Sequence, residues 1–257
     1  MLEIRHQAIT DGLSTLEAYN QLYTEREILQ RDSFYLWLIS LLQPQPNHTL
    51  LDISCGQGRL VELASQQGLD AIGVDFSLTG LCRGQQTLRN TSWAVSDGEQ
   101  LPFPDQCVDY VTHIGSLEHY ERPSQGVSEI ARVLKPSGRA CVLLPNAYGL
   151  LGNIQHVQRT GEIFDDGQPL QRYATRRTWQ ALLEAGGLVI EQVFPYGEVD
   201  FPRTQADRRW LLQRPHKIAR GLLNLLLPKN WANDFAFVCR RRSGTTQPLY
   251  YPMLPNL

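Results

Sequence analysis

The chain has 257 residues, 42% of them hydrophobic, and a formal net charge of −2. These values indicate a globular protein with one sizeable core, and they argue against a nucleic-acid partner because no basic excess is present to neutralise phosphates. The five cysteines form no C-x-x-C pair, the N-terminus lacks an apolar signal-like stretch, and no apolar run has the length of a membrane span. We therefore expect reduced thiols and a cytoplasmic location.

The N-terminal region, residues 1–46, is predicted to be a helical cap. Between residues 13 and 42, large apolar side chains recur at spacings of three and four, and two prolines then end the pattern. The cap either packs on the core or acts as a lid over a ligand. As a lid it would contribute Tyr19, Tyr23 and Arg31.

Residues 47–242 alternate between apolar runs and helical patterns, which predicts a parallel sheet covered by helices on both faces. Strands are expected in a run ending at Asp52 and at 71–75, 92–95, 107–114, 139–144, 188–194 and 234–239. Helices are expected around 60–64 and at 78–89, 124–134 and 176–185. The remaining segments are interpreted as a partly helical substrate-side insertion at 146–174, a basic, leucine-rich helical segment at 207–228 and a tail at 243–257.

The most specific motif lies between Thr49 and Ser77. The first strand ends in Asp52, a turn of small residues carries Gly56 and Gly58, and the next strand ends on Asp75. A carboxylate about twenty residues beyond a glycine turn can accept hydrogen bonds from a ribose diol. The spacing therefore predicts an adenosine-containing cofactor.

Two residues favour S-adenosylmethionine over a dinucleotide. Val61 occupies the position at which a dinucleotide site places a third small residue, for close helix–strand packing. Asp52 would repel a pyrophosphate but suits a cationic amino-acid moiety. A nicotinamide-dependent oxidoreductase remains the alternative, since it would share the fold and Asp75.

Four motifs in order resemble the class I S-adenosylmethionine-dependent methyltransferases. They are the block 52–58, Asp75, the segment DGEQLPF at 97–103, and CVDYVTHIGSLEHYERP at 107–123 followed by EIARVLKPSGR. The resemblance covers roughly residues 48–145 and is closest to the small-molecule branch, methyltransferase type 11, which includes quinone-biosynthesis enzymes. It implies a Rossmann-like, seven-stranded, mostly parallel sheet with helices on both faces and an antiparallel last strand at 234–239.

The resemblance also implies roles for individual residues. Asp75 would bind the ribose and Phe76 would flank the adenine. The other cofactor contacts that it implies are Ser54, Gly56 and Gly58 at the amino-acid end, Asp97 and Gly98 bordering the adenine, and Ile114 against the adenosine. Asp52 is expected at the turn, and Arg31 imperfectly matches an arginine that some relatives place before the first strand. Ser54 departs from the family, which more commonly has glycine there.

His119, just past the fourth strand, is the candidate general base. Ligands of open parallel sheets bind at the carboxyl ends of the strands, and imidazole is the usual base near neutral pH. Glu118 would orient His119 or act itself; alternatively, both residues begin a surface helix. His156 is a second candidate base, and His113 is expected to be packed or to neighbour the cofactor.

No essential metal is predicted. Some relatives hold a divalent cation with an acid–x–x–acid–His arrangement at this point, but Gly115 occupies the first acid position. The two ligands that remain make a poor metal site.

The expected function is methyl transfer from S-adenosylmethionine to a small-molecule acceptor, with a hydroxyl oxygen as the favoured target. A catalytically silent cofactor-binding relative is a further alternative. The segment 207–228 also suggests weak association with a membrane surface. The simpler interpretation is a helix that packs its leucines on the core and leaves its arginines in water.

Overall fold

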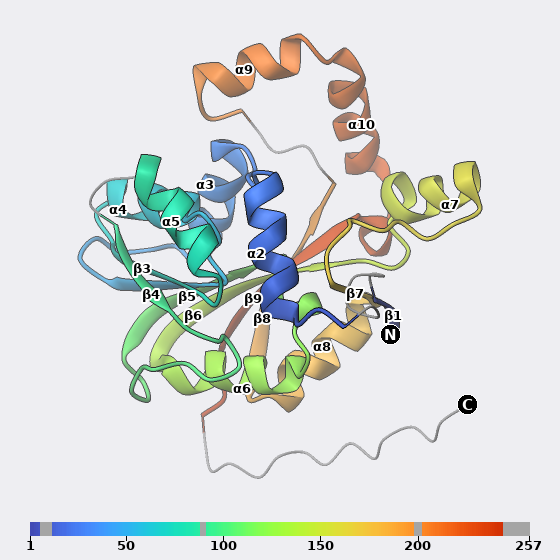
Figure 1. Ribbon diagram of the computed structural model, residues 1–257. Coiled ribbons are helices and arrows are strands. Elements are labelled where there is room, and N and C mark those ends of the chain that lie inside the picture. Colours follow the sequence, from blue (N-terminus) through green and yellow to red (C-terminus); the bar gives the residue numbers. More distant parts are fainter. Residues whose placement is uncertain (6–11, 88–90, 198–201, 244–257) are drawn as a thin grey trace.

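A seven-stranded mixed sheet forms the centre of the structure, a computed structural model that describes residues 1–5, 12–87, 91–197 and 202–243 (Figure 1). The strand order is β4-β3-β2-β5-β6-β9-β8. The bounds are β2 Thr49–Ile53, β3 Asp70–Asp75, β4 Ser92–Val95, β5 Val108–Ile114, β6 Leu134–Pro145, β8 Leu188–Tyr196 and β9 Asp234–Arg241. The pairs from β4 to β6 are parallel, and β9 is antiparallel to both of its neighbours. The predicted sheet and its antiparallel last strand are confirmed.

Helices cover both faces of this sheet (Figure 1). Two separate apolar clusters show the division: α3 (Asp32–Leu41) and α4 (Arg59–Gln66) pack on one face, and α6 (Pro123–Val133) and α8 (Arg176–Ala185) on the other. The helix α5 (Leu78–Thr87) contacts β3 and β4. Residues 88 and 89 of the helix predicted there lie outside the described residues.

The central strands are apolar on both sides because both sides are covered. In β2, Leu50 belongs to the cluster with α3 and α4, whereas Leu51 belongs to the cluster with α6 and α8. This explains why these strands show continuous apolar runs rather than alternation in the sequence. Residues 135–138, Lys-Pro-Ser-Gly, have a turn-like sequence but lie inside β6, where the pairing with β5 shifts register between Val108 and Tyr110.

The N-terminal helical pattern divides into two helices with different positions. The first, α2 (Thr15–Glu25), begins with a capping box in which Ser14 and Glu17 satisfy each other's backbone donors. Residues 26–31 separate it from α3, which covers the sheet. The helix α2 is tied to the end of β3 by a hydrogen bond of 2.6 Å from the Ser77 hydroxyl to Asn20.

Two short strands escaped prediction from the sequence. β1 (Leu2–Arg5) and β7 (Leu170–Tyr173) form a separate antiparallel pair. All four residues of β7 are buried although two of them, Gln171 and Arg172, are polar, so no apolar run marked the strand. The segment 146–174 also contains a π-helical turn, η2 (Leu150–Ile154), and the helix α7 (Gln155–Thr160).

The basic, leucine-rich segment forms two helices, α9 (Gln205–Leu212) and α10 (Pro215–Leu226), followed by the short turn η3 (Lys229–Trp231). The expectation that leucines pack inward and arginines face water is wrong for α10. The Leu222 and Leu226 side chains are exposed, whereas the Arg220 guanidinium is partly buried and donates to the Leu151 carbonyl.

None of the described helices combines the length and the apolar character needed to cross a bilayer. A cytoplasmic location stays a prediction. Of the predicted tail at 243–257, all but residue 243 lies outside the described residues.

Gly58 and Gly68 provide a matched test of the turn after β2. Both have left-handed backbones, with φ of +73° and +83°. A Cβ on Gly58 would lie 1.6 Å from the Trp93 ring, whereas the nearest atom to a Cβ on Gly68 is 3.8 Å away. Gly68→Ala should lower the free energy of unfolding by about 1 kcal/mol through backbone strain, and Gly58→Ala by roughly 2–5 kcal/mol because overpacking adds to it. Urea unfolding measures both; equal losses would contradict this packing.

Candidate functional site

The sheet topology opens a crevice between the carboxyl ends of β2 and β5. The chain runs outward from β2 through β3 to β4 and then returns to place β5 beside β2. Ligands of open α/β sheets bind at such a reversal of strand order. A cavity of about 1160 Å³ lies there, walled by residues that follow β2, β3, β4 and β5 and by residues of the N-terminal cap.

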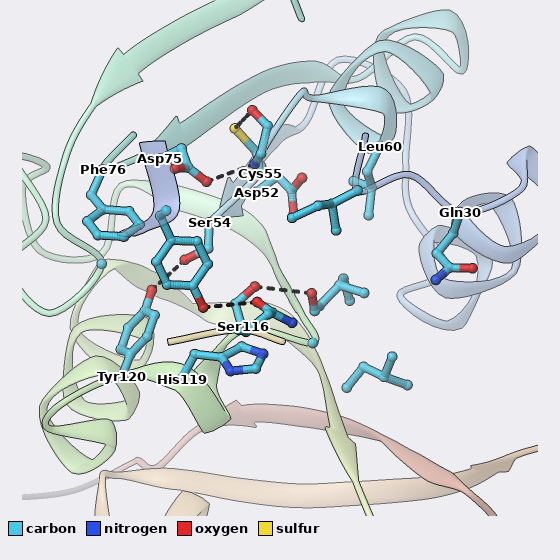
Figure 2. A pocket seen from close by; sticks show the side chains of 18 of the residues that line it. Gln30, Asp52, Ser54, Cys55, Leu60, Asp75, Phe76, Ser116, His119 and Tyr120 are labelled. Atoms are coloured by element: carbon cyan, nitrogen blue, oxygen red, sulfur yellow. Dashed lines mark hydrogen bonds between the residues drawn. The ribbon is translucent and has the colours of Figure 1, made fainter. Parts of the chain in front are cut away.

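Most of the predicted cofactor residues line this cavity. Figure 2 shows Asp52, Cys55 and Asp75 on one side and His119 on the opposite side, with Tyr120 beside Ser54. The predicted residues in the cavity wall are Arg31, Asp52, Ser54, Gly56, Asp75, Phe76, Asp97, Gly98 and Ile114. Gly58 is not in the wall; it precedes α4 and packs against Trp93.

Asp75 connects the glycine turn to the tip of β3. One carboxylate oxygen accepts from the Gly56 backbone N–H at 2.8 Å, and the other accepts from the Ser77 N–H at 2.8 Å. The residue is only 2% exposed, and this burial raises the pKa of Asp75 to about 6, although the two backbone bonds oppose the rise. The remaining lone pairs of this carboxylate can accept hydrogen bonds from a ligand.

Asp52 is a second buried carboxyl in the same wall. It accepts a hydrogen bond of 2.7 Å from the Thr112 hydroxyl, on the neighbouring strand β5. Burial raises the pKa of Asp52 to about 7, because the Thr112 bond offsets only part of the desolvation and nearby Asp75 adds to the rise. This end of the cavity therefore suits a cationic ligand group and disfavours an anionic one.

Ser54 adopts a left-handed backbone, with φ of +57°, at the position where the family more commonly has glycine. Its hydroxyl lies 2.8 Å from the Tyr120 hydroxyl. The same tyrosine explains Gly98, because a Cβ there would lie 1.8 Å from the Tyr120 oxygen. Tyr120 thus holds the turn after β2 and the loop after β4 at fixed positions in the wall, a role that sequence reasoning missed.

Glu99 was also missed. It is buried and lines the cavity. Its carboxylate forms an ion pair of 2.7 Å with the Arg122 guanidinium and also accepts a hydrogen bond from the Arg122 backbone N–H. Asp97 beside it caps its own loop by accepting from the Glu99 N–H at 2.8 Å. The only sequence signal for Glu99 was its place inside the 97–103 motif.

His119 has one ring nitrogen committed to the protein. Its Nδ1 contacts the Leu170 carbonyl, which can only accept, so Nδ1 carries the proton and Nε2 keeps a lone pair in the neutral ring. Nε2 lies 3.8 Å from a Glu118 oxygen and 4.0 Å from Asp166. Burial lowers the pKa of His119, so the ring is neutral at physiological pH, while Asp166 opposes that shift.

Glu118 is buried beside His119 but does not line the cavity. One of its carboxyl oxygens has no hydrogen-bond partner in the described part of the chain. Burial raises the pKa of Glu118 well above its ordinary value, with further contributions from Asp166 and Asp234, so the surroundings favour the neutral form of this carboxyl. Neither residue begins a regular surface helix; both belong to the short 3-10 turn η1 (Leu117–His119).

The two other histidines considered from the sequence, His113 and His156, lie outside the cavity wall. His113 is fully buried in β5 against the Tyr120 ring, and burial lowers its pKa to about 3, so it is packed as expected. His156 lies on α7 against Phe164. The described residues contain no group of three or more His, Cys, Asp or Glu side chains arranged to hold a metal ion.

The cap reaches the cavity through its aromatic side chains. Tyr19 of α2 packs edge-on against Phe76 at 5.3 Å and against His119 at 6.4 Å between ring centroids. Its hydroxyl donates to Gln168 at 2.9 Å, which links the cap to the segment before β7. Arg31 lies over the Trp210 ring at 4.1 Å and so joins the cap to α9.

Asp52 offers a test of the site's electrostatics. Its folded pKa of about 7 exceeds the ordinary 3.8, so unfolding releases a proton and stability falls as pH rises between these values. Asp52→Asn keeps an acceptor for Thr112 but cannot ionise. Its free energy of unfolding should therefore exceed that of the parent by an amount that grows about 1.4 kcal/mol per pH unit between pH 5 and 7. Urea unfolding at several pH values measures this; a pH-independent difference would contradict it.

Residues 51–142 match the family model described as a methyltransferase domain. The demethylmenaquinone methyltransferase of Corynebacterium kroppenstedtii is 37% identical over 101 residues, which cover 39% of this chain and 43% of that protein. An uncharacterized methyltransferase of Mycobacterium tuberculosis is 30% identical over 146 residues, 56% of this chain and 58% of that protein. The chain thus spans about half the length of these curated relatives.

Solved structures share the fold at low sequence identity. An S-adenosylmethionine-dependent methyltransferase from Mesorhizobium loti has a TM-score of 0.59 at 17% identity, covering 81% of this chain and 98% of that one. A cyclase has a TM-score of 0.58 at 18% identity, covering 83% and 82%. These similarities concern the fold alone, since a cyclase shares it. Residues 51–142 therefore match a methyltransferase domain, and the motif order and sheet topology of this part of the chain resemble those of class I S-adenosylmethionine-dependent methyltransferases.

Proposed function

We propose that the protein transfers a methyl group from S-adenosylmethionine to a hydroxyl group of a small-molecule acceptor. The observation that carries this proposal is the geometry of His119. Its Nδ1–H donates to the Leu170 carbonyl, so the lone pair of the neutral ring is on Nε2. His119 and Asp75 line the same cavity. Burial keeps the imidazole neutral and ready to accept a proton.

The cavity wall fits the cofactor that the family implies. Gly56 has φ of +55° and lies against the Tyr23 hydroxyl, so a side chain there would fill the space beside the turn. Asp75 would accept from the ribose hydroxyls, and the buried carboxyl of Asp52 suits the cationic end. The other residues that would hold this cofactor are Ser54, Phe76, Asp97, Gly98 and Ile114, with Gly58 supporting the turn and Arg31 at the cap.

The cap supports a small-molecule acceptor. We propose that residues 1–46 act as the lid of domain 47–242, because Tyr19, Tyr23 and Arg31 of the cap line the cavity. The cavity wall is also rich in other aromatic and apolar side chains, which suits an acceptor with a ring. They are Ile28, Leu29, Phe34, Tyr35, Leu143, Tyr196 and Trp210.

The chemistry required of the protein is modest. When bound, S-adenosylmethionine supplies an electrophilic methyl group carried by a sulfonium sulfur. After methyl transfer, that sulfur is a neutral thioether and therefore a good leaving group. The chain's residues need to align the acceptor, exclude water and remove the hydroxyl proton. His119 would take that proton at Nε2. The Glu118 carboxyl, 3.8 Å from this nitrogen, would help to hold the ring in place.

Methylation at carbon is a second candidate. The ubiquinone/menaquinone biosynthesis C-methyltransferase of Geobacter sulfurreducens is 35% identical over 103 residues. Removing the proton from a ring hydroxyl makes neighbouring ring carbons nucleophilic as well as the oxygen, so His119 would serve either reaction. We favour oxygen as the target, and analysis of the product distinguishes the two.

The remaining alternatives make different predictions. A nicotinamide dinucleotide would bring its pyrophosphate to the glycine turn near Asp52, a carboxyl that lines the cavity and disfavours an anion. Such an enzyme would bind a reduced nicotinamide and not S-adenosylhomocysteine. A catalytically silent relative would bind S-adenosylhomocysteine but turn over no acceptor.

Asp75 is tested by cofactor affinity. Asp75→Ala should weaken binding of S-adenosylhomocysteine by roughly 1–3 kcal/mol, because a charged hydrogen-bond partner of the ribose is lost. Isothermal calorimetry measures the affinity. Asp75→Asn is the companion variant, since it retains an acceptor for the glycine turn, and thermal melts establish that both variants are folded. Unchanged affinity in both would remove Asp75 from the cofactor site.

His119 is tested by turnover, with an acceptor identified by screening phenols, quinols, sugars and acids. His119→Ala should lower turnover roughly a hundredfold or more and leave S-adenosylhomocysteine affinity nearly unchanged, because only proton removal is lost. Since burial lowers the pKa of His119, the parent's turnover should stay flat above neutral pH and fall only on the acid side.

Glu118→Gln is the matched control. An amide there has nearly the shape of a carboxyl whose neutral form is favoured by burial, so its effect on turnover should be much smaller than that of His119→Ala. Equal turnover in His119→Ala and the parent would exclude His119 as the base.

A further inference from the structure

The helices α9 and α10 form a C-terminal arm, defined here as residues 202–231, that projects beyond the helices covering the sheet (Figure 1). α10 contacts α9, and it is joined to the rest of the molecule by the Arg220 guanidinium, which donates to the Leu151 carbonyl of η2. The outer side of the arm is the largest feature that methyl transfer does not explain.

The arm exposes an unusual number of large apolar side chains. Leu212 at the end of α9 is 77% exposed, and Leu222 and Leu226 of α10 are 61% and 82% exposed. The other exposed apolar side chains of the arm are Ile218, Leu223 and Trp231. Ile218, Leu222 and Leu226 are four residues apart, so they form one stripe along the helix. Contiguous apolar surface of this kind marks a binding site.

The arm is also strongly basic. It contains Arg203, Arg208, Arg209, Arg214, Lys217, Arg220 and Lys229 against a single acid, Asp207. Its net charge is therefore +6, and because the whole chain carries −2, the remainder carries −8. Asp207 is engaged in the capping box of α9 with Thr204. The exposed arginines at 208 and 209 lie close in sequence to Leu212.

Apolar and basic side chains are arranged on different sides of the arm. Lys217 lines the cavity and Arg220 is turned toward η2, whereas the exposed Leu222 and Leu226 point away from the protein body. Exposed Arg208, Arg209 and Lys229 flank that apolar side along the chain. A helix that lies in a membrane interface has this combination of an apolar stripe and basic flanks.

We propose that the C-terminal arm binds the anionic surface of a lipid bilayer. The exposed Leu222, Leu223 and Leu226 of α10 enter the boundary between headgroups and acyl chains, and the flanking basic residues contact lipid phosphates. A second copy of the chain fits this surface poorly, because a symmetric dimer would place the exposed Arg208, Arg209 and Lys229 of two basic arms close to each other. The membrane is thus favoured by charge as well as by apolar area.

This docking would place the bilayer next to the arm, which contributes lining residues to the cavity. Trp210 of α9 and Lys217 of α10 are both lining residues. An acceptor dissolved in lipid would then reach the cavity without crossing bulk water. The docking itself does not depend on methyl transfer, so it is tested without cofactor or acceptor.

The experiment is vesicle co-sedimentation of the full chain. Vesicles contain either phosphatidylcholine alone or a mixture with phosphatidylglycerol. We expect binding to the anionic vesicles at least tenfold tighter than to the neutral ones, and weaker binding at high salt. Leu222→Asp/Leu226→Asp should abolish binding, and Arg208→Glu/Arg209→Glu should weaken it at least tenfold.

Leu78→Asp is the matched control. Leu78 is 58% exposed on α5, outside the arm, so this variant should bind anionic vesicles as the parent does. Circular dichroism establishes that each variant is folded. The proposal would be overturned if the parent protein did not bind anionic vesicles, or if folded arm variants bound them as the parent does. So would a stable dimer, seen by light scattering, that Leu222→Asp/Leu226→Asp converts to monomer.

Discussion

The hydrogen bond from the Gly56 N–H to the Asp75 carboxylate is the contact on which the site depends. It joins the turn after β2 to the tip of β3, and the second oxygen of the same carboxylate fixes the start of α5 through the Ser77 N–H. Because Asp75 is buried, its pKa rises to about 6, and ionisation near neutral pH costs free energy that these two donors partly restore. A ligand that donates further hydrogen bonds to this carboxylate would therefore be bound strongly.

The opposite wall is built from segments far apart in the chain. Arg172 of β7 pairs with Glu3 of β1 at 2.8 Å and donates to the Tyr120 carbonyl. Leu170 of the same strand fixes the His119 ring. The small β1–β7 sheet thus positions the turn η1, and Tyr19 of the cap packs against the His119 ring. This arrangement supports a single role for the cap and the 146–174 segment, which is to enclose the acceptor beside His119.

The central sheet was predictable from the sequence, and so was the gathering of most proposed cofactor residues in one cavity wall, for a local reason. Asp52, Gly56 and Asp75 end strands or form turns of one β-α-β unit, so their spacing nearly determines their geometry. Tyr120 and the Leu170 carbonyl were not predictable in the same way, because their contacts join residues more than fifty positions apart. The exposure of Leu222 and Leu226 on α10 could not be predicted either. A leucine-rich helical pattern is the same whether the leucines face the core or the solvent.

The central claim is that the carboxylate of Asp75 binds the sugar of a sulfonium nucleoside in the cavity between β2 and β5. A crystal structure of the protein soaked with S-adenosylhomocysteine tests this most directly. The account predicts the ribose hydroxyls within hydrogen-bond distance of the Asp75 carboxylate, with the thioether sulfur in the same cavity as His119. A nucleoside bound elsewhere, or one whose ribose makes no contact with Asp75, would contradict it.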